Sequence, residues 1–221
     1  MNIISSDSIK KTAIDLLLFY INNSNLEGGY NLLKENEIDL ELKTNIGVTP
    51  LFLAVKNNNL TYTNMLLEFG ADPNTIVDNK IGGESPLTLA SSQGYFEIAE
   101  LLLDYGADPN MQNNNGLFCL HLAAKNGDLN MVLLLITRGG DPNIRDINGY
   151  NASYYANKLN HLSLLDYLPP PEYVTPEILV DYKEIVMDKR FDVNADDMKK
   201  IRAQIGKDLK ATQNKNKSKK K

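Results

Sequence analysis

The sequence holds one cysteine, two histidines and no tryptophan. A single cysteine excludes an internal disulfide framework and a cysteine-rich zinc module. Two histidines leave too few nitrogen and sulfur ligands for a transition-metal centre. Apolar runs such as Leu16 to Ile21 are too short to cross a bilayer, and this run follows Asp15 instead of the cationic start of a signal peptide. We therefore expect a soluble, intracellular protein with no transmembrane segment, no metal and no cofactor.

Charge is divided unevenly along the chain, whose 23 basic and 28 acidic residues give a net charge of −5. Residues 1–171 hold 10 basic and 19 acidic residues, residues 172–198 hold 3 and 8, and residues 199–221 hold 10 and 1. An acidic body thus carries a strongly basic end. Such an end usually meets an acidic protein surface, a nucleic acid or membrane headgroups, and the alternative is a solvated tail that only aids solubility.

Two short phrases recur in the body in one register. GVTPL at Gly47 recurs as GESPL at Gly83, and in degraded form at Gly116 and Gly149; these glycines lie 36, 33 and 33 residues apart. The second phrase, GADPN or GGDPN, starts at Gly70, Gly106 and Gly139. One three-residue insertion near residues 80–82 explains the longer spacing in both phrases. Their agreement predicts a repeat architecture.

Each repeat predicts a helix, a turn, a second helix and a hairpin. Pro50 can begin a helix, because the missing N–H of proline costs nothing at the first helical position. The side chain of Thr49 can cap this helix. In the second helix Met65, Leu66 and Leu67 should face inward. Gly70 should end that helix in a left-handed conformation, and the chain then turns outward into a hairpin.

These phrases resemble the ankyrin repeat family, whose pattern is G-x-T-P-L-H-L-A-A followed by L-L-L-x-x-G-A-D-x-N. The match is nearly complete over residues 47–74 and 83–110, whereas Phe118 and Cys119 replace the T-P pair in the next unit. The resemblance implies an all-α solenoid of helix-turn-helix and β-hairpin units over residues 1–168. It has about five units, including two atypical caps. The units are expected at residues 8–41, 42–74, 75–110, 111–143 and 144–168.

Both caps depart from the family pattern. In the first we expect helices over residues 8–22 and 25–36, and Glu37 falls where the family has glycine, so its turn is open. In the last, residues 152–156 read ASYYA in place of P-L-H-L-A.

Residues 169–221 are expected to form a C-terminal extension. A proline-rich linker over 169–175 leads to amphipathic helices over 176–211, and a disordered basic tail follows over 212–221. These helices either pack on the end of the repeats or dock on a partner. The cationic residues expected to bind an acidic surface are Lys199, Lys200, Arg202, Lys207 and Lys210.

No constellation for catalysis is found, and we expect no enzyme. In the ankyrin pattern the position of His121 bonds neighbouring backbone. Cys119 takes the proline position as a small buried residue. These two residues, at i and i+2 on a helix, face different ways and cannot form a nucleophile pair. His161 is expected to be a surface or capping residue.

The resemblance implies that a concave groove of hairpin tips and inner helices binds another protein. Ile46, Val77 and Ile147 are the first candidates for apolar anchors, and packing between adjacent hairpins is their alternative role. The full set of expected partner-binding positions is Lys43, Asn45, Ile46, Lys56, Ile76, Val77, Asn79, Lys80, Gln93, Tyr95, Gln112, Asn114, Lys125, Arg145 and Ile147.

Two function classes follow. The first is a protein–protein interaction adaptor or scaffold, whose groove holds one or more intracellular proteins while the basic extension engages a second or acidic surface. The second is an electrostatic anchor, whose basic helix binds a cytoskeletal, membrane or nucleic-acid polyanion. A third arrangement has the basic tail folding back on the acidic body. We expect a cytoplasmic location, with cytoskeletal or nuclear association as alternatives.

Overall fold

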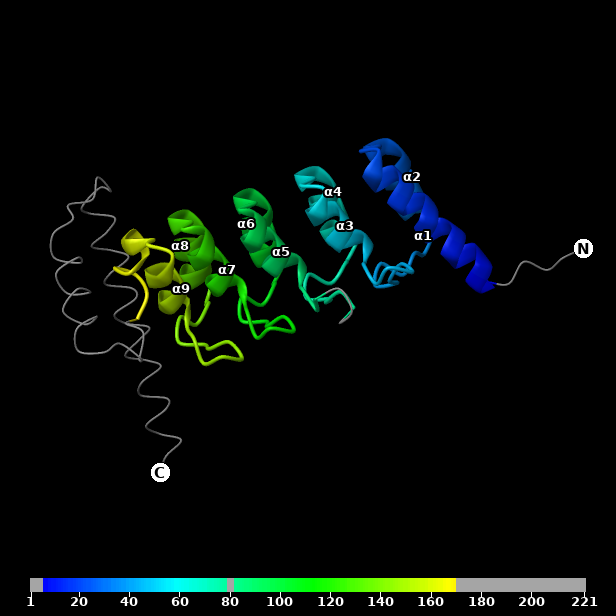
Figure 1. Ribbon diagram of the computed structural model, residues 1–221. Helices are drawn as coiled ribbons and strands as arrows, with labels where there is room; N and C mark the ends of the chain where they lie inside the picture. Colours follow the sequence, from blue (N-terminus) through cyan, green and yellow to red (C-terminus); the bar gives the residue numbers. More distant parts are fainter. Residues whose placement is uncertain (1–5, 79–81, 170–221) are drawn as a thin grey trace, which may run out of the picture. The chain divides into compact units, whose positions relative to one another are not determined.

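The computed structural model describes residues 6–78 and 82–169, which belong to the first of two compact units of the chain, residues 1–172. The expected linker beyond Pro169, the C-terminal helices and the basic tail lie outside the described residues. Helices of the described part come in pairs (Figure 1). They are α1 (Ser6–Asn22), α2 (Leu26–Glu35), α3 (Pro50–Lys56), α4 (Leu60–Glu68), α5 (Pro86–Gln93), α6 (Phe96–Asp104), α7 (Cys119–Asn126), α8 (Leu129–Thr137), α9 (Ala152–Lys158) and the 3₁₀ helix η2 (Leu162–Leu164).

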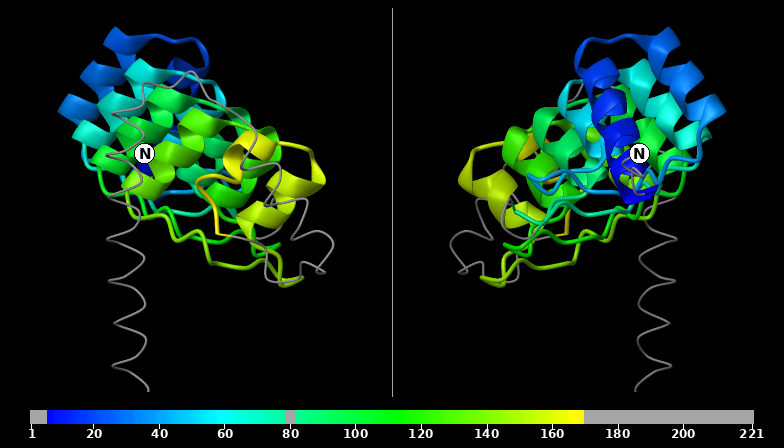
Figure 2. Two further views of the ribbon diagram at one scale, coloured as in Figure 1. Left: turned by 90° about the vertical axis from the view of Figure 1, so that its left-hand side faces the viewer. Right: turned by 90° about the vertical axis from the view of Figure 1, so that its right-hand side faces the viewer.

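The pairs stack in two rows. The first helix of each pair packs on the first helix of the next, which gives an inner row of α1, α3, α5, α7 and α9. The second helices form an outer row of α2, α4, α6, α8 and η2. The loops that connect one pair to the next lie along one edge of the stack, as the views along it show (Figure 2). The expected all-α repeat solenoid is confirmed, while the residue boundaries of its units stay predictions.

The helix starts follow the local chemistry expected of them. Thr49 caps α3 by accepting a hydrogen bond from the Phe52 N–H at 3.3 Å, and Pro50 is the first helical residue. In the next unit Ser85 and Thr88 form a reciprocal capping box in which each side chain accepts from the other's backbone N–H. Both arrangements satisfy donors that a helix start leaves free.

Two glycines show why the recurring phrases need glycine. Gly70 follows α4 with φ of +89°, in the left-handed region that favours glycine. Gly116 has φ of +67°, and a Cβ atom there would lie 2.7 Å from the backbone nitrogen of Ile147 in the next loop. The second glycine therefore permits a close approach between adjacent hairpins.

The expected β-hairpins contain turns but no β-strand within residues 6–78 and 82–169. Each loop closes by one backbone hydrogen bond, such as Thr44 N–H to Val48 C=O at 2.9 Å. An antiparallel ladder would return a bond from Val48 N–H to the Thr44 carbonyl. Here the Thr44 side chain accepts that N–H instead, at 3.2 Å, so the ladder stops after one bond.

Small residues hold the inner row together. Ala54, Ala90, Ala123 and Ala156 occupy equivalent positions of four consecutive inner helices, and all four are fully buried. A methyl side chain lets two helices approach closely while it still excludes water. The larger core residues come from both rows: Leu51, Leu87 and Leu120 of the inner row and Leu66, Leu102 and Leu135 of the outer row are all buried.

The two ends of the stack are atypical, as expected for caps. Helix α2 ends at Glu35, and its C-cap Asn36 is extended with φ of −132°, so this first unit turns without a left-handed residue before Glu37. In the fifth unit the second helix shrinks to the three residues of η2, whose N-cap is His161. The hydroxyl of Ser153 donates a hydrogen bond to the Pro169 carbonyl and ties the end of the described chain back to α9.

Candidate partner-binding surface

The inner helices present a row of apolar side chains that they do not fully bury. Its members occupy equivalent positions, spaced by 34, 36, 33 and 33 residues, and they are Phe19, Leu53, Leu89, Leu122 and Tyr155. Phe19 is 59% exposed, and the other four are half-buried. We call these five residues the inner apolar row. The side of α3 that carries Leu53 therefore meets solvent as well as the core.

Lysines accompany this row one helical turn further on. Lys56, Lys125 and Lys158 lie three residues after Leu53, Leu122 and Tyr155, a spacing that puts both side chains on one helix face. All three lysines are exposed, and Ser92 takes the equivalent position in α5. The surface therefore combines an apolar stripe with cationic groups.

A tyrosine cluster forms the end of this surface at α9. The rings of Tyr150 and Tyr154 stack with centroids 3.7 Å apart, and Tyr155 meets Tyr154 edge-on at 5.5 Å. The ammonium of Lys125 lies 5.5 Å from the Tyr155 ring centroid, and that of Lys158 lies 5.6 Å from the Tyr154 ring. These are cation–π distances, at which a ring attracts a cation without neutralising it.

Asp146 fixes the cluster from below. Its carboxylate accepts hydrogen bonds from the Tyr155 hydroxyl and from the backbone N–H groups of Asn148 and Tyr150. Burial by itself would raise the pKa of Asp146, but these hydrogen bonds lower the pKa below its usual value. Burial raises the pKa of the Tyr155 hydroxyl, and its hydrogen bond to Asp146 raises this pKa further. Asp146 therefore stays ionised and holds Tyr155 in place.

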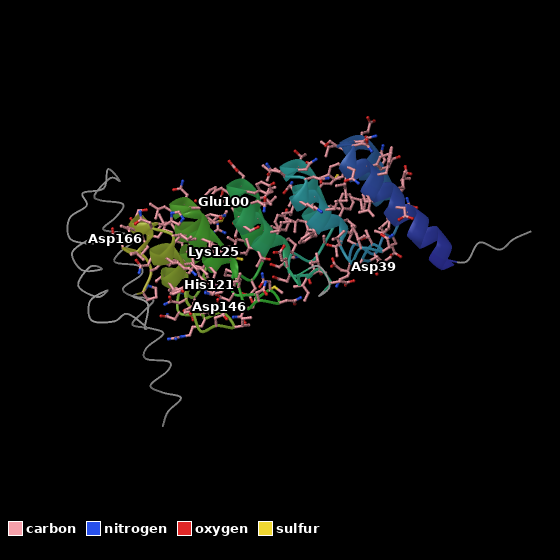
Figure 3. All side chains as sticks on the ribbon, in the orientation of Figure 1. Asp39, Glu100, His121, Lys125, Asp146 and Asp166 are labelled. Carbon is pink, nitrogen blue, oxygen red and sulfur yellow. The ribbon has the colours of Figure 1, made fainter. Side chains whose placement is uncertain are left out.

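His121 links α7 to the same loop. Its side chain is 0% exposed, and its Nε2 atom lies 2.9 Å from the Tyr150 carbonyl. The Nδ1 atom accepts a bond from the Phe118 N–H at 3.4 Å, so Nε2 carries the proton and donates. Burial lowers the pKa of His121 to about 4, which keeps the ring neutral. Figure 3 shows His121 and Lys125 along α7, with Asp146 in the loop beneath them.

The hairpin tips differ in exposure. Ile46 is 61% exposed and Ile147 is 70% exposed, so both can meet a partner. Val77 is 1% exposed and packs with Val48 and Phe52. The prediction of an exposed apolar anchor at Val77 is therefore wrong, and its alternative role, packing between neighbouring hairpins, is the one observed.

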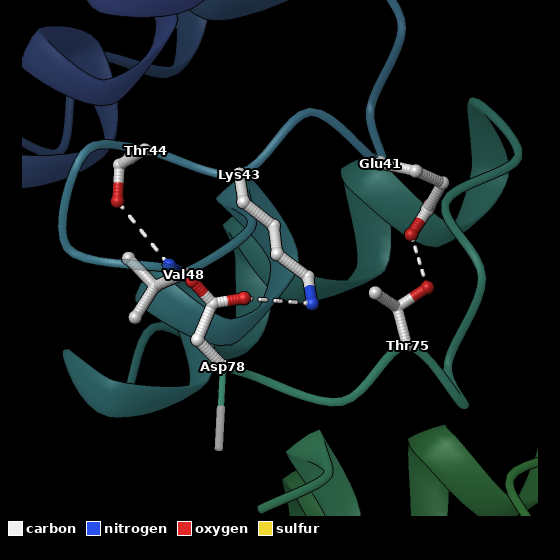
Figure 4. A network of polar contacts seen from close by, with 6 residues as sticks. All are labelled: Glu41, Lys43, Thr44, Val48, Thr75 and Asp78. Carbon is white, nitrogen blue, oxygen red and sulfur yellow. Dashed lines mark hydrogen bonds and ion pairs between the residues drawn. The ribbon is translucent and has the colours of Figure 1, made fainter. Parts of the chain in front are cut away.

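Polar contacts join the second hairpin to the third (Figure 4). The Lys43 ammonium lies 3.1 Å from a carboxylate oxygen of Asp78, and both side chains are partly exposed. Glu41 accepts hydrogen bonds from the Asp72 N–H, at 2.8 Å, and from the Thr75 hydroxyl. These contacts set the distance between adjacent hairpin tips. Lys43, expected to bind a partner, thus also has a structural partner.

The other predicted positions fall into three groups. Tyr95 and Arg145 are half-buried. Asn79, Lys80 and the five basic residues of the C-terminal extension lie outside the described residues. The exposed members are Asn45, Ile76, Gln93, Gln112 and Asn114. Among these, the Gln112 amide donates a hydrogen bond to the Arg145 carbonyl at 3.1 Å, which links the fourth hairpin to the fifth.

Cys119 and His161, which are candidates for catalysis by residue type, both contact other parts of the repeats. Cys119 is fully buried, and this burial raises the pKa of its thiol to about 12, so the reactive thiolate does not form near neutral pH. His161 lies 3.0 Å from the Lys125 carbonyl at the turn of the preceding unit. Within residues 6–78 and 82–169, no group of three acidic, histidine or cysteine side chains is placed to hold a metal ion. No helix in these ranges is long and apolar enough to cross a membrane.

The inner apolar row and the tyrosine cluster were missed in the sequence. Tyr154 and Tyr155 stand where the repeat pattern has histidine and leucine, so they read as degraded pattern residues. Aligning the last four units by their glycines would have placed Tyr155 in one column with Leu53, Leu89 and Leu122, although Phe19 lies in a unit without that glycine. That alignment is the signal by which the row could have been found.

Comparison with protein families gives two matches to the described part of the chain. A profile described as ankyrin repeats in three copies matches residues 16–113, and a profile of ankyrin repeats in many copies matches residues 109–156. The comparison with curated proteins gave no match. The matched residues run from within α1 to within α9, so they include all four pairs from α1 to α8 and part of α9 but not η2. Repeats of this kind generally mediate protein–protein interaction. The chain belongs to the ankyrin repeat proteins.

Proposed function

We propose that this protein is a non-enzymatic adaptor that holds a partner protein on the exposed side of its inner helices. The observation that carries the proposal is the inner apolar row, which runs through the five helices of the inner row at equivalent positions. Exposed apolar side chains that line up across elements mark interaction surfaces, whereas single scattered ones do not. The row, the lysines beside it and the exposed tips Ile46 and Ile147 together form the proposed groove.

Rigidity supports the same proposal. The buried alanines fix the inner helices against one another, and the hairpins are tied by Lys43–Asp78 and by Gln112 to Arg145. A surface that is already ordered loses little conformational entropy when a partner binds. The basic C-terminal extension is proposed to engage a second, acidic surface. Its net charge of +9 over residues 199–221 is the support for that role.

Photo-crosslinking on the full chain tests the groove. A photo-reactive residue is placed at position 56 on inner helix α3, or at position 68 on outer helix α4 of the same unit, where Lys56 and Glu68 are both exposed. We expect discrete partner adducts in cell extract from position 56 and none from position 68. Adducts from position 68 alone would contradict the proposal.

A variant of the basic tail distinguishes the adaptor function from the electrostatic anchor function. The variant Lys199→Gln, Lys200→Gln, Arg202→Gln keeps the repeats intact and removes three positive charges. If the adaptor proposal holds, adducts at position 56 persist in this variant. If they disappear, and association falls steeply with salt, the electrostatic anchor is the better description.

A further inference from the structure

Charge is segregated between the two rows of helices. The inner helices α3, α5, α7 and α9 together contain three lysines and no acidic residue. The outer helices α2, α4 and α6 contain six acidic residues and one lysine, Lys34. On the outer side Arg138 already pairs with Asp104 and lies 4.0 Å from Glu100. The repeat body is acidic as a whole, yet these four inner helices are cationic, whereas α1 of the same row holds two acidic residues and two lysines.

The inner cations are available for a ligand. Neither Lys125 nor Lys158 forms an ion pair within the part of the chain that the structure describes; each lies over a tyrosine ring instead. Two carboxylates in the turns beside α7 and α9 already have other partners. The Asp146 carboxylate accepts hydrogen bonds from Asn148, Tyr150 and Tyr155, and Asp128 caps α8 by accepting from the Met131 N–H at 3.0 Å. Two positive charges beside an apolar row are thus without a counter-charge among residues 6–78 and 82–169.

We infer that the groove takes an acidic segment of a partner protein. Its carboxylates pair with Lys125 and Lys158, and an apolar side chain between them packs on Leu122 and Tyr155. This inference rests on the proposed function and adds the chemistry of the partner. Charge complementarity of this kind selects partners and speeds their encounter.

The geometry also specifies the spacing of the carboxylates. Packed helices lie about 8–10 Å apart, and the two lysines hold equivalent positions on adjacent inner helices. An extended chain rises about 3.3 Å per residue, so carboxylates at i and i+3 span that distance. Ser92 and not lysine stands in α5, so the cationic part of the groove is centred on α7 and α9.

Peptide display on the full-length protein tests the inference. The probe is a library of random 12-residue peptides, selected against the immobilised wild type. We expect selected peptides to be enriched in aspartate and glutamate at i and i+3, with an apolar residue between. Their affinity should fall about tenfold or more in the double variant Lys125→Glu, Lys158→Glu, since each reversed charge turns an attraction into a repulsion.

Lys34→Glu is the matched control. The Lys34 ammonium also lies over a tyrosine ring, 5.9 Å from the centroid of Tyr30, but on outer helix α2. We expect its affinity for the selected peptides to stay within about twofold of wild type. The basic tail is the same in all variants, so any binding it contributes is common to them. Circular dichroism and thermal unfolding confirm that each variant folds.

Each other outcome overturns the inference in a distinct way. Selected peptides without acidic enrichment that still crosslink from position 56 would leave the adaptor function standing and remove the acidic partner. Equal losses in the double variant and in Lys34→Glu would show a general charge effect. Binding of a 20-nucleotide single-stranded DNA that depends on Lys125 and Lys158, without acidic peptides, would replace the protein segment by a nucleic acid.

Discussion

One repeat position holds an apolar side chain at one junction of the stack and a polar side chain at another. The two junctions lie between the second and third units and between the fourth and fifth units. In the second unit this position is Phe52, which packs with Val48, Val77 and the half-buried Leu89 of the next unit. In the fourth unit it is His121, which hydrogen-bonds to the backbone of Phe118 and Tyr150. Both side chains are buried, and both join a helix to the following hairpin.

The difference shows that the hairpin can be fixed either by apolar contact or by directed hydrogen bonds. An apolar cluster gains free energy from the area that it removes from water and imposes little direction. A buried imidazole requires both of its nitrogens to be satisfied and must remain uncharged. The first junction should therefore be sensitive to lost volume, and the second to pH.

The largest effect is expected from the apolar junction. Phe52→Ala should lower the free energy of unfolding by about 3–5 kcal/mol, because it opens a cavity between two hairpins and a helix. The measurement is urea unfolding followed by circular dichroism. Phe19→Ala is the matched control: Phe19 is also on an inner helix but is 59% exposed, and its removal should cost less than about 1 kcal/mol. Equal losses in the two variants would refute the cluster's role.

The polar junction should respond to acid. The pKa of His121 is about 4 in the folded protein, against an ordinary 6.5, so the unfolded chain takes up the proton first as pH falls. Stability contributed by neutral His121 is therefore full above pH 6.5 and is lost progressively down to pH 4. The difference between these two pKa values corresponds to about 3 kcal/mol in the free energy of unfolding.

Two variants isolate this contribution, because the chain has only two histidines. His121→Gln should be less stable than wild type at pH 7.5 and should lose the dependence between pH 6.5 and 4. His161→Gln should keep it. Urea midpoints across this pH range provide the measurement, and a slope that survives in His121→Gln would show that another group is responsible.

These two junctions also mark what could be predicted from the sequence. The helix pairs were predictable because caps and helix ends depend on local residues such as Thr49, Pro50 and Gly70. The exposure of the apolar side chains at the hairpin tips could not be predicted. Val77 is buried because it packs on Val48 and Phe52, whereas Ile147 is 70% exposed.

The candidate surface divides in the same way. Lys56 and Lys125 were predicted from positions that the repeat pattern leaves free, and they lie beside the inner apolar row. Leu53 and Leu122 belong to the pattern itself, so the sequence did not single them out as surface positions. A helix of seven or eight residues between two neighbours has a narrow buried side, so a pattern leucine at its edge remains half-exposed.

The smallest effect is expected at the ion pair that joins the tips of the second and third hairpins. Lys43 and Asp78 are both partly exposed, so solvent and salt screen their attraction. A double-mutant cycle of Lys43→Ala and Asp78→Ala should give a coupling energy below about 1 kcal/mol that declines with added salt. A coupling above about 2 kcal/mol would instead make this ion pair comparable to the apolar cluster beneath it. Because the expected cost is small, Lys43→Ala leaves the repeats folded. Any change in partner crosslinking from position 56 in this variant then reports on binding at the hairpin tip and not on stability.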